Sequence, residues 1–135
     1  MTLIDGINID SLLKAFSKFD KFWQHISTEQ EKAGPIHAFE YCFELTWKTM
    51  KRLLNVRGQI ANSPREVIRL AALENFIDDP ERWFDFLKKR NMTTHTYDEK
   101  AAETVLSVLA DFASEMNKFF NRIKVDSNVY RRKTP

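Results

Sequence analysis

Apolar residues recur at three- and four-residue spacing along most of this 135-residue chain, which is the pattern of helices that bury one face. Only 3 Gly and 4 Pro interrupt the pattern. A β-sandwich or barrel needs a turn every ~8–12 residues and would use more of both residue types. The chain is therefore expected to be all-α, and its length suits one domain with its own core.

Proline, glycine and capping residues mark where the helices should begin and end. The spacing predicts a first helix over residues 9–31, which Gly34-Pro35 separates from a second helix over residues 35–55. Gly58 stands just past the second helix, where a left-handed residue commonly stops a helix.

Two capping sequences open the next helices. Ser63-Pro64-Arg65-Glu66 predicts a short third helix to about residue 75, and Asp79-Pro80-Glu81 predicts the start of a fourth. A final long helix begins near Asp98. Together these elements predict an up-down antiparallel bundle of about five helices, in which a short helix joins a four-helix core.

The domain should cover residues 8–124, with residues 125–135 as a loose C-terminal tail. Lys and Arg number 21 and Asp and Glu 19, a balance of +2 that is typical of neither a strongly basic nucleic-acid binder nor an acidic tail. Cys42 is the only cysteine, which excludes an intramolecular disulfide and fits a reducing compartment. No apolar run is long enough to cross a membrane. We therefore expect a soluble, cytoplasmic protein.

The common catalytic motifs are absent from the sequence. It has no glycine-rich phosphate loop, no nucleophile elbow and no HExxH pair, and its three histidines lie far apart. Neither a metal site nor a cofactor is expected. Glu40 and Glu44 are one helical turn apart, but no second Glu-x-x-His helix accompanies them, so we interpret them as solvated or partner-facing.

Two wider patterns in the sequence, one of aromatic residues and one of cations, have structural explanations. The aromatic residues of the first two helices hold helical spacing, so they are expected in the core and not as base-stacking platforms. Between Leu45 and Arg65 the chain has five cations and no acid, which fits a solvated helix face or, alternatively, a surface that guides RNA.

The segment between the fourth and final helices holds the candidate site. Three cations, Lys88, Lys89 and Arg90, precede a break in the apolar pattern, and His95 and Tyr97 follow it. One reading is structural: cations complement the negative end of the helix dipole, and His95 and Tyr97 satisfy a turn or pack on the bundle.

The other reading is chemical. Arg90 could hold a phosphate with its planar fork, and His95 could transfer a proton near neutral pH. These two groups suffice for metal-free RNA cleavage if a base deprotonates the 2′-hydroxyl and a cation stabilises the phosphorane. A continuous helix would separate residues five apart by about 140°. The pair can therefore converge only if the helix ends between them or if a second subunit supplies one group.

Three blocks of the chain resemble a known family. Arg90, His95 and Tyr97 match the Rx4HxY signature of the HEPN superfamily. Residues 39–49, residues 63–69 and residues 90–99 together resemble its nucleotidyltransferase substrate-binding branch, which is related to the HepT-like toxins. The resemblance covers residues 8–124.

The resemblance implies a helical homodimer encoded beside a small nucleotidyltransferase that is its partner. It implies that Arg90, Asn91 and His95 form a metal-independent ribonuclease site at the dimer interface, and that the transferase neutralises the toxin by adding AMP to Tyr97. Lys88 and Lys89 would assist by binding phosphate.

Two further readings stay open at this stage. The chain could be a non-catalytic subunit that holds a nucleotide or acceptor for the transferase, in which case Arg90 grips phosphate without proton transfer. It could also be only a dimerisation scaffold. Whether the chain is an enzyme is thus left open by the sequence.

Overall fold

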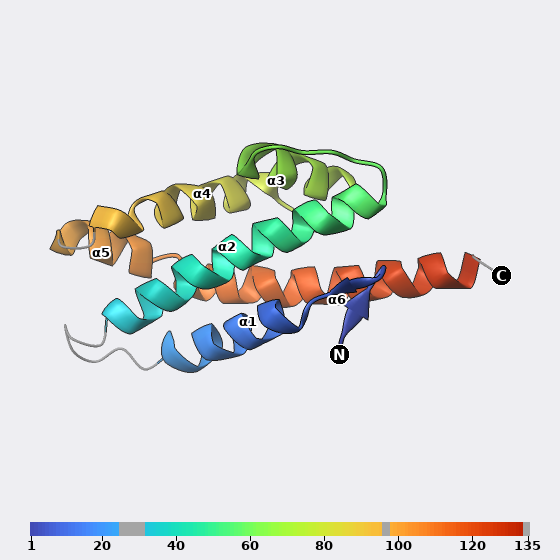
Figure 1. The fold of residues 1–135 in the computed structure, drawn as a ribbon. Helices are drawn as coiled ribbons and strands as arrows, with labels where there is room; N and C mark the ends of the chain where they lie inside the picture. The colour runs from blue at the N-terminus through green and yellow to red at the C-terminus, as the bar shows by residue number, and fades with distance from the viewer. Residues whose placement is uncertain (25–31, 96–97, 134–135) are drawn as a thin grey trace.

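Four long helices form the body of the protein, which we describe from a computed structural model. The described residues are 1–24, 32–95 and 98–133, with side chains described up to residue 124. These helices run alternately up and down along one axis, which confirms the expected all-α antiparallel bundle (Figure 1). They are α1 (Asp10–Phe22), α2 (Ala33–Val56), α4 (Pro80–Asn91) and α6 (Leu109–Lys133).

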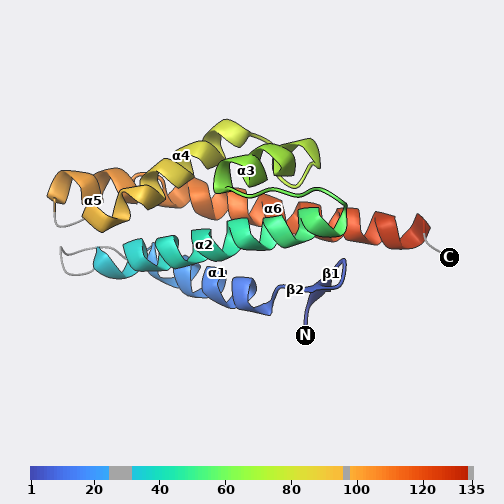
Figure 2. The same ribbon diagram turned by 45° about the horizontal axis from the view of Figure 1, so that its top comes forward.

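Shorter elements connect the long ones. They are α3 (Pro64–Leu73), the 3-10 helix η2 (Thr93–His95) and α5 (Glu99–Leu106). In both ribbon views α2 lies between α1 on one side and α3 with α4 on the other (Figure 2).

The predicted helix boundaries at the caps are confirmed. The Ser63 hydroxyl accepts a hydrogen bond from the Glu66 N–H at 3.2 Å, and the Asp79 carboxylate accepts one from the Glu81 N–H at 3.0 Å. Gly58, at φ +83°, follows α2 and lets the chain fold back over its last carbonyls. The capping residues therefore act where the sequence placed them.

A small hairpin precedes α1 and was not predicted. Strands β1 (Leu3–Ile4) and β2 (Ile7–Asn8) pair antiparallel around Asp5 and Gly6, which both have positive φ. Asp-Gly between short apolar stretches is a strong signal for such a turn. The buried side chain of Ile4 attaches the hairpin to the core.

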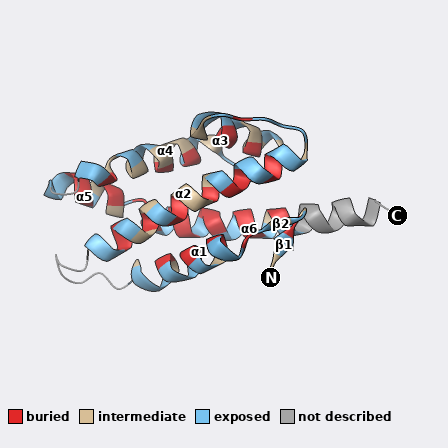
Figure 3. Ribbon diagram, in the orientation of Figure 1, coloured by how far each residue is buried: buried red, intermediate tan, exposed pale blue. Residues whose placement is uncertain are grey.

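The core is centred on Phe112 of α6. Its ring centroid lies 5.0 Å from that of Phe39 on α2, 5.2 Å from Phe19 on α1 and 5.4 Å from Phe86 on α4. All these rings are buried, and buried residues face inward along α2 and α6 (Figure 3). One aromatic side chain of α6 thus joins the three other long helices.

The aromatic prediction needs one correction. Phe22, expected in the core, is 45% exposed, because it is the last residue of α1. Trp47 is only partly buried, and its indole N–H has a polar partner described below.

The final helix expected from residue 98 is divided into α5 and α6 at Ser107 and Val108. The Ser107 hydroxyl donates to the Thr104 carbonyl at 2.6 Å, and the Thr104 hydroxyl donates to the Lys100 carbonyl at 2.9 Å. Such side-chain bonds compete with the helical ladder and favour a bend. The bend lets α5 pack beside η2 and α2.

The backbone of α6 continues as a helix to Lys133, through most of the residues expected to form a loose tail. In the part of the chain that the structure describes, no helix is long and apolar enough to cross a membrane.

Candidate functional site

The candidate site begins where α4 ends. The last helical residue is Asn91, and Met92 caps the helix. The Thr93 hydroxyl donates to the Arg90 carbonyl at 2.7 Å, and η2 then turns the chain through His95. The helix thus ends between Arg90 and His95, which is one of the two alternatives under which these side chains could converge.

Arg90 is held by a carboxylate on another helix. Its Nη2 lies 2.7 Å from Oε2 of Glu44 on α2, and its Nη1 donates to Oδ1 of Asn91 at 3.3 Å. A guanidinium has five N–H groups. Each terminal nitrogen therefore keeps one N–H beyond these two bonds, and the Arg90 side chain is 33% exposed. These groups are available to a phosphate.

Glu44 was expected to be solvated or partner-facing, and the structure shows that it has partners within the chain. Its Oε2 also accepts the indole N–H of Trp47 at 3.1 Å, and its Oε1 lies 3.4 Å from Nζ of Lys48. The carboxylate is therefore held within the chain by Arg90, Trp47 and Lys48, with 29% of the side chain exposed. The Lys48 spacing of i+4 was visible in the sequence, but the contact with Arg90 was not.

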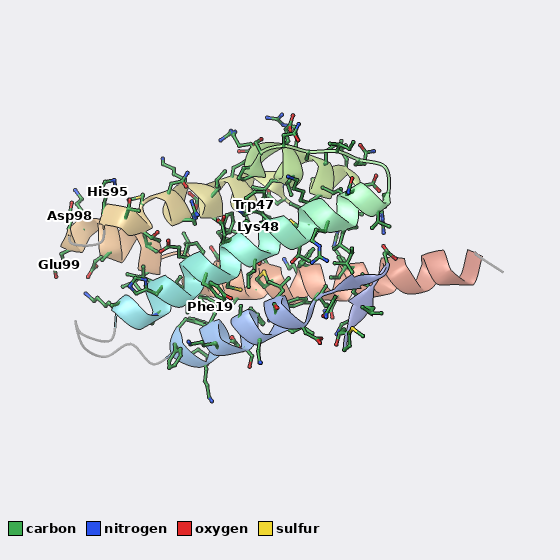
Figure 4. The ribbon with its side chains drawn as sticks, viewed as in Figure 1. Phe19, Trp47, Lys48, His95, Asp98 and Glu99 are labelled. Atoms are coloured by element: carbon green, nitrogen blue, oxygen red, sulfur yellow. The ribbon has the colours of Figure 1, made fainter. Side chains whose placement is uncertain are left out.

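His95 is exposed at the corner between α4 and α5 (Figure 4). The backbone N–H of His95 donates to the Met92 carbonyl at 2.9 Å, and the His95 backbone carbonyl accepts from the Asp98 N–H at 3.1 Å. The described contacts join Arg90 to Asn91 but contain none between Arg90 and His95. Tyr97 lies outside the described residues.

The two lysines of the segment differ. Lys89 is mostly covered, and its Nζ lies 2.7 Å from Oδ1 of Asp85. Lys88 is exposed and has no ion-pair partner among the described residues. Lys88 is therefore better placed than Lys89 to bind phosphate.

Metal-binding side chains do not gather in the described part of the chain: it holds no group of three His, Cys, Asp or Glu residues that could bind an ion. His37 is exposed on α2, and His25 lies outside the described residues. Burial raises the pKa of the Cys42 thiol to about 12, against a smaller opposing effect of its hydrogen bond with Thr46.

Comparisons with known proteins agree with this architecture. The family model for nucleotidyltransferase substrate binding protein like sequences matches residues 7–125. A probable ribonuclease HepT from Haemophilus influenzae is 32% identical over 97 residues, which cover 68% of this chain and 66% of that protein. The match thus spans just under two thirds of that relative's length.

Two solved structures share the fold. A protein from Thermus thermophilus has a TM-score of 0.78 and 28% identity, covering 83% of this chain and 98% of that one. A Haemophilus influenzae protein has a TM-score of 0.76 and 26% identity, covering 87% of this chain and 99% of that one. The latter structure is reported to reveal the fold of a substrate binding domain of a nucleotidyltransferase.

The helical bundle and the proteins that it matches define a protein of the HEPN class. Within that class, the chain belongs to the nucleotidyltransferase substrate binding protein like family.

Proposed function

We propose that the protein is a metal-independent endoribonuclease that works as a homodimer. His95 acts as general acid and base, Arg90 holds the scissile phosphate, and Asn91 orients a reacting oxygen. In the first step the RNA 2′-oxygen loses its proton, attacks the adjacent phosphorus and displaces the 5′-oxygen, which takes up a proton. Arg90 stabilises the charge that develops on the phosphoryl oxygens.

The observation that carries this proposal is the end of α4 at Asn91. Because the helix stops there, Arg90 keeps its orientation on Glu44 while His95 moves onto a separate turn. Both side chains are accessible, as a site for a polymeric substrate requires. The name of the Haemophilus relative, a probable ribonuclease, supports the same activity.

The cellular role follows from the same family. We propose that a small nucleotidyltransferase encoded nearby is the partner, and that it neutralises the ribonuclease as an antitoxin by transferring AMP to Tyr97. The added phosphate would place an anion two residues from His95, where it competes with the RNA phosphate by charge and volume.

RNA cleavage in excess chelator tests the activity. The protein is first checked by mass for an unmodified Tyr97, and wild type is then compared with His95→Ala on single-stranded RNA of mixed sequence. His37→Ala is the matched control, because His37 is also an exposed histidine. Cleavage that survives chelation and His37→Ala but not His95→Ala is expected. Cleavage that persists in His95→Ala would contradict the proposed mechanism.

AMP transfer is tested separately. Incubation with the partner transferase and ATP should raise the mass of wild type but not that of Tyr97→Phe, and the modified protein should lose cleavage. An equal mass gain in Tyr97→Phe would place the modification elsewhere.

A second candidate function is a non-catalytic substrate-binding subunit of the transferase. The reported description of the second structural relative as a substrate binding domain favours it. In that case wild type would cleave no RNA, and nucleotide binding would survive His95→Gln but weaken strongly in Arg90→Ala.

A further inference from the structure

Beside the Arg90 pair, an open hollow of about 480 Å³ lies between α3 and α4, and of its lining residues only Asn91 has a part in the function proposed above. Phe84, Lys88 and Asn91 line it along one face of α4, at spacings of four and three residues, and Arg65 lines it from α3. Its volume lies within the range of about 300–1,000 Å³ typical of ligand sites.

Arg65 and Phe84 form a layered platform in this hollow, with the guanidinium over the ring. The Arg65 guanidinium carbon lies 4.7 Å from the centroid of the Phe84 ring, so the cation covers a ring that is itself half-buried. Nucleobases stack on both aromatic rings and guanidinium planes in single-stranded nucleic-acid sites. The platform therefore fits a nucleobase.

The lining of the hollow holds two cations, Arg65 and Lys88, and two carboxylates, Glu81 and Asp85. Neither Arg65 nor Lys88 has an ion-pair partner among the described residues. Asp85 also lines the hollow, but Lys89 neutralises its carboxylate at 2.7 Å. Glu81 is the remaining acid, at the first turn of α4 and about 15 Å along the axis from Asn91. The end of the hollow nearest Asn91 is thus cationic and suits a phosphate.

The hollow is continuous with the candidate site. Asn91 lines it and also accepts the hydrogen bond from Arg90. Phe84 and Asn91 are about 10 Å apart along the helix axis. A strand whose scissile phosphate lies on Arg90 would therefore direct a neighbouring nucleotide over Lys88 toward Arg65.

We propose that this hollow is a second RNA subsite, in which the base of a nucleotide flanking the scissile phosphate stacks on the Arg65 guanidinium, which the Phe84 ring supports from behind, while Lys88 binds its phosphate. The inference rests on the proposed ribonuclease function for its choice of RNA, and it extends the binding site one turn or more beyond the Arg90–His95 segment.

Binding, not cleavage, is the test. Labelled single-stranded RNA is titrated by fluorescence anisotropy against full-length His95→Ala protein, which leaves the RNA intact, and against the same protein with Arg65→Ala, Arg65→Lys or Lys88→Ala. Arg69→Ala is the matched control for Arg65, because Arg69 is an exposed cation of the same helix. Lys14→Ala on α1 is the control for Lys88.

Arg65→Ala should weaken RNA binding roughly 10-fold, as loss of one stacked base does. Arg65→Lys keeps the positive charge but loses the planar guanidinium, so it should recover little of the lost RNA affinity. Lys88→Ala should reduce the magnitude of the slope of log affinity against log salt by about 0.7. Glu81→Gln should tighten RNA binding, because it removes a carboxylate that repels the phosphates of the RNA strand.

Several results would overturn the subsite. Equal losses in Arg65→Ala and Arg69→Ala would mean diffuse charge attraction only, and full recovery in Arg65→Lys would exclude stacking. Free AMP binding as tightly as RNA, with the same Arg65 dependence, would make the hollow a mononucleotide site. If cleavage depends on His95 but RNA binding does not depend on Arg65, the subsite is refuted and the ribonuclease function stands. Arg65-dependent RNA binding by a wild type that never cleaves refutes only the ribonuclease.

Discussion

Arg90 and Glu44 are 46 positions apart in the chain, and their side chains meet at 2.7 Å between Nη2 and Oε2. The contact joins the last turn of α4 to the middle of α2. Trp47 and Lys48 hold the same carboxylate from their own positions on α2. Glu44 is therefore the group that sets the direction of the Arg90 guanidinium.

Glu44→Gln should separate positioning from binding. The amide can still accept a hydrogen bond but no longer pairs as a charge, so we expect kcat for RNA cleavage to fall roughly 10-fold while KM stays within about 2-fold. Because both side chains are about one-third exposed, the free energy of unfolding should drop by only about 1 kcal/mol. Glu40→Gln, one turn earlier on α2, is the control. Unchanged kcat in Glu44→Gln would show that the orientation of the Arg90 guanidinium does not depend on the charge of Glu44.

Mixing two inactive variants tests whether the site is shared between subunits. If Arg90 of one subunit acts with His95 of the other, a mixed dimer of Arg90→Ala and His95→Ala contains one intact site, and cleavage should reappear after subunit exchange. Each variant alone stays inactive. No recovery in a mixture whose exchange is verified by mass would place both groups of a site in one chain.

Phe112→Ala should destabilise the bundle severely. The substitution empties the point where Phe19, Phe39 and Phe86 meet, so a loss of about 3–5 kcal/mol in the free energy of unfolding is expected by urea titration. Phe22→Ala, at an exposed position, should stay within about 0.5 kcal/mol. A loss below about 1 kcal/mol in Phe112→Ala would mean that the core does not depend on this ring.

Ser63→Ala removes the cap of α3. Its hydroxyl accepts the Glu66 N–H, so the free energy of unfolding should fall by about 1 kcal/mol. Ser114→Ala, at an exposed position inside α6, should have little effect or stabilise slightly. Equal thermal shifts in the two variants would contradict the capping role.

Cys42 should resist alkylation in the folded protein. With burial raising its pKa from 9.0 to about 12, the thiolate fraction at pH 8 falls from about 0.1 to about 10⁻⁴. Iodoacetamide should therefore modify it only in denaturant, as mass spectrometry would report. Because the folded protein favours the neutral thiol, this contribution to stability is complete below pH 9 and is lost as the pH rises toward 12. Rapid native labelling at pH 8 would contradict the burial.

The helical elements could be predicted because their signals are local. Ser63, Asp79 and Gly58 act on backbone groups within a few residues, so their roles depend little on the rest of the fold. The Asp5-Gly6 hairpin has an equally local signal, an Asp-Gly pair between short apolar stretches, which helical periodicity does not contain. The bend at Ser107 depends on hydroxyl groups that also occur within straight helices, so it had no clear sequence signal.

The sequence by itself determined the all-α class, the helix starts, the order of the elements and the Arg90–His95 motif, because each rests on spacing along one helix or on a cap. The Lys89–Asp85 pair, at i,i+4 spacing on one helix, has a local signal. Only the tertiary structure decided that Glu44 holds Arg90 and that Arg65 covers Phe84. These contacts depend on how the helices are rotated against one another, which is set by packing around Phe112. Periodicity tells which face of a helix is buried, but it does not tell which residue of another helix lies opposite.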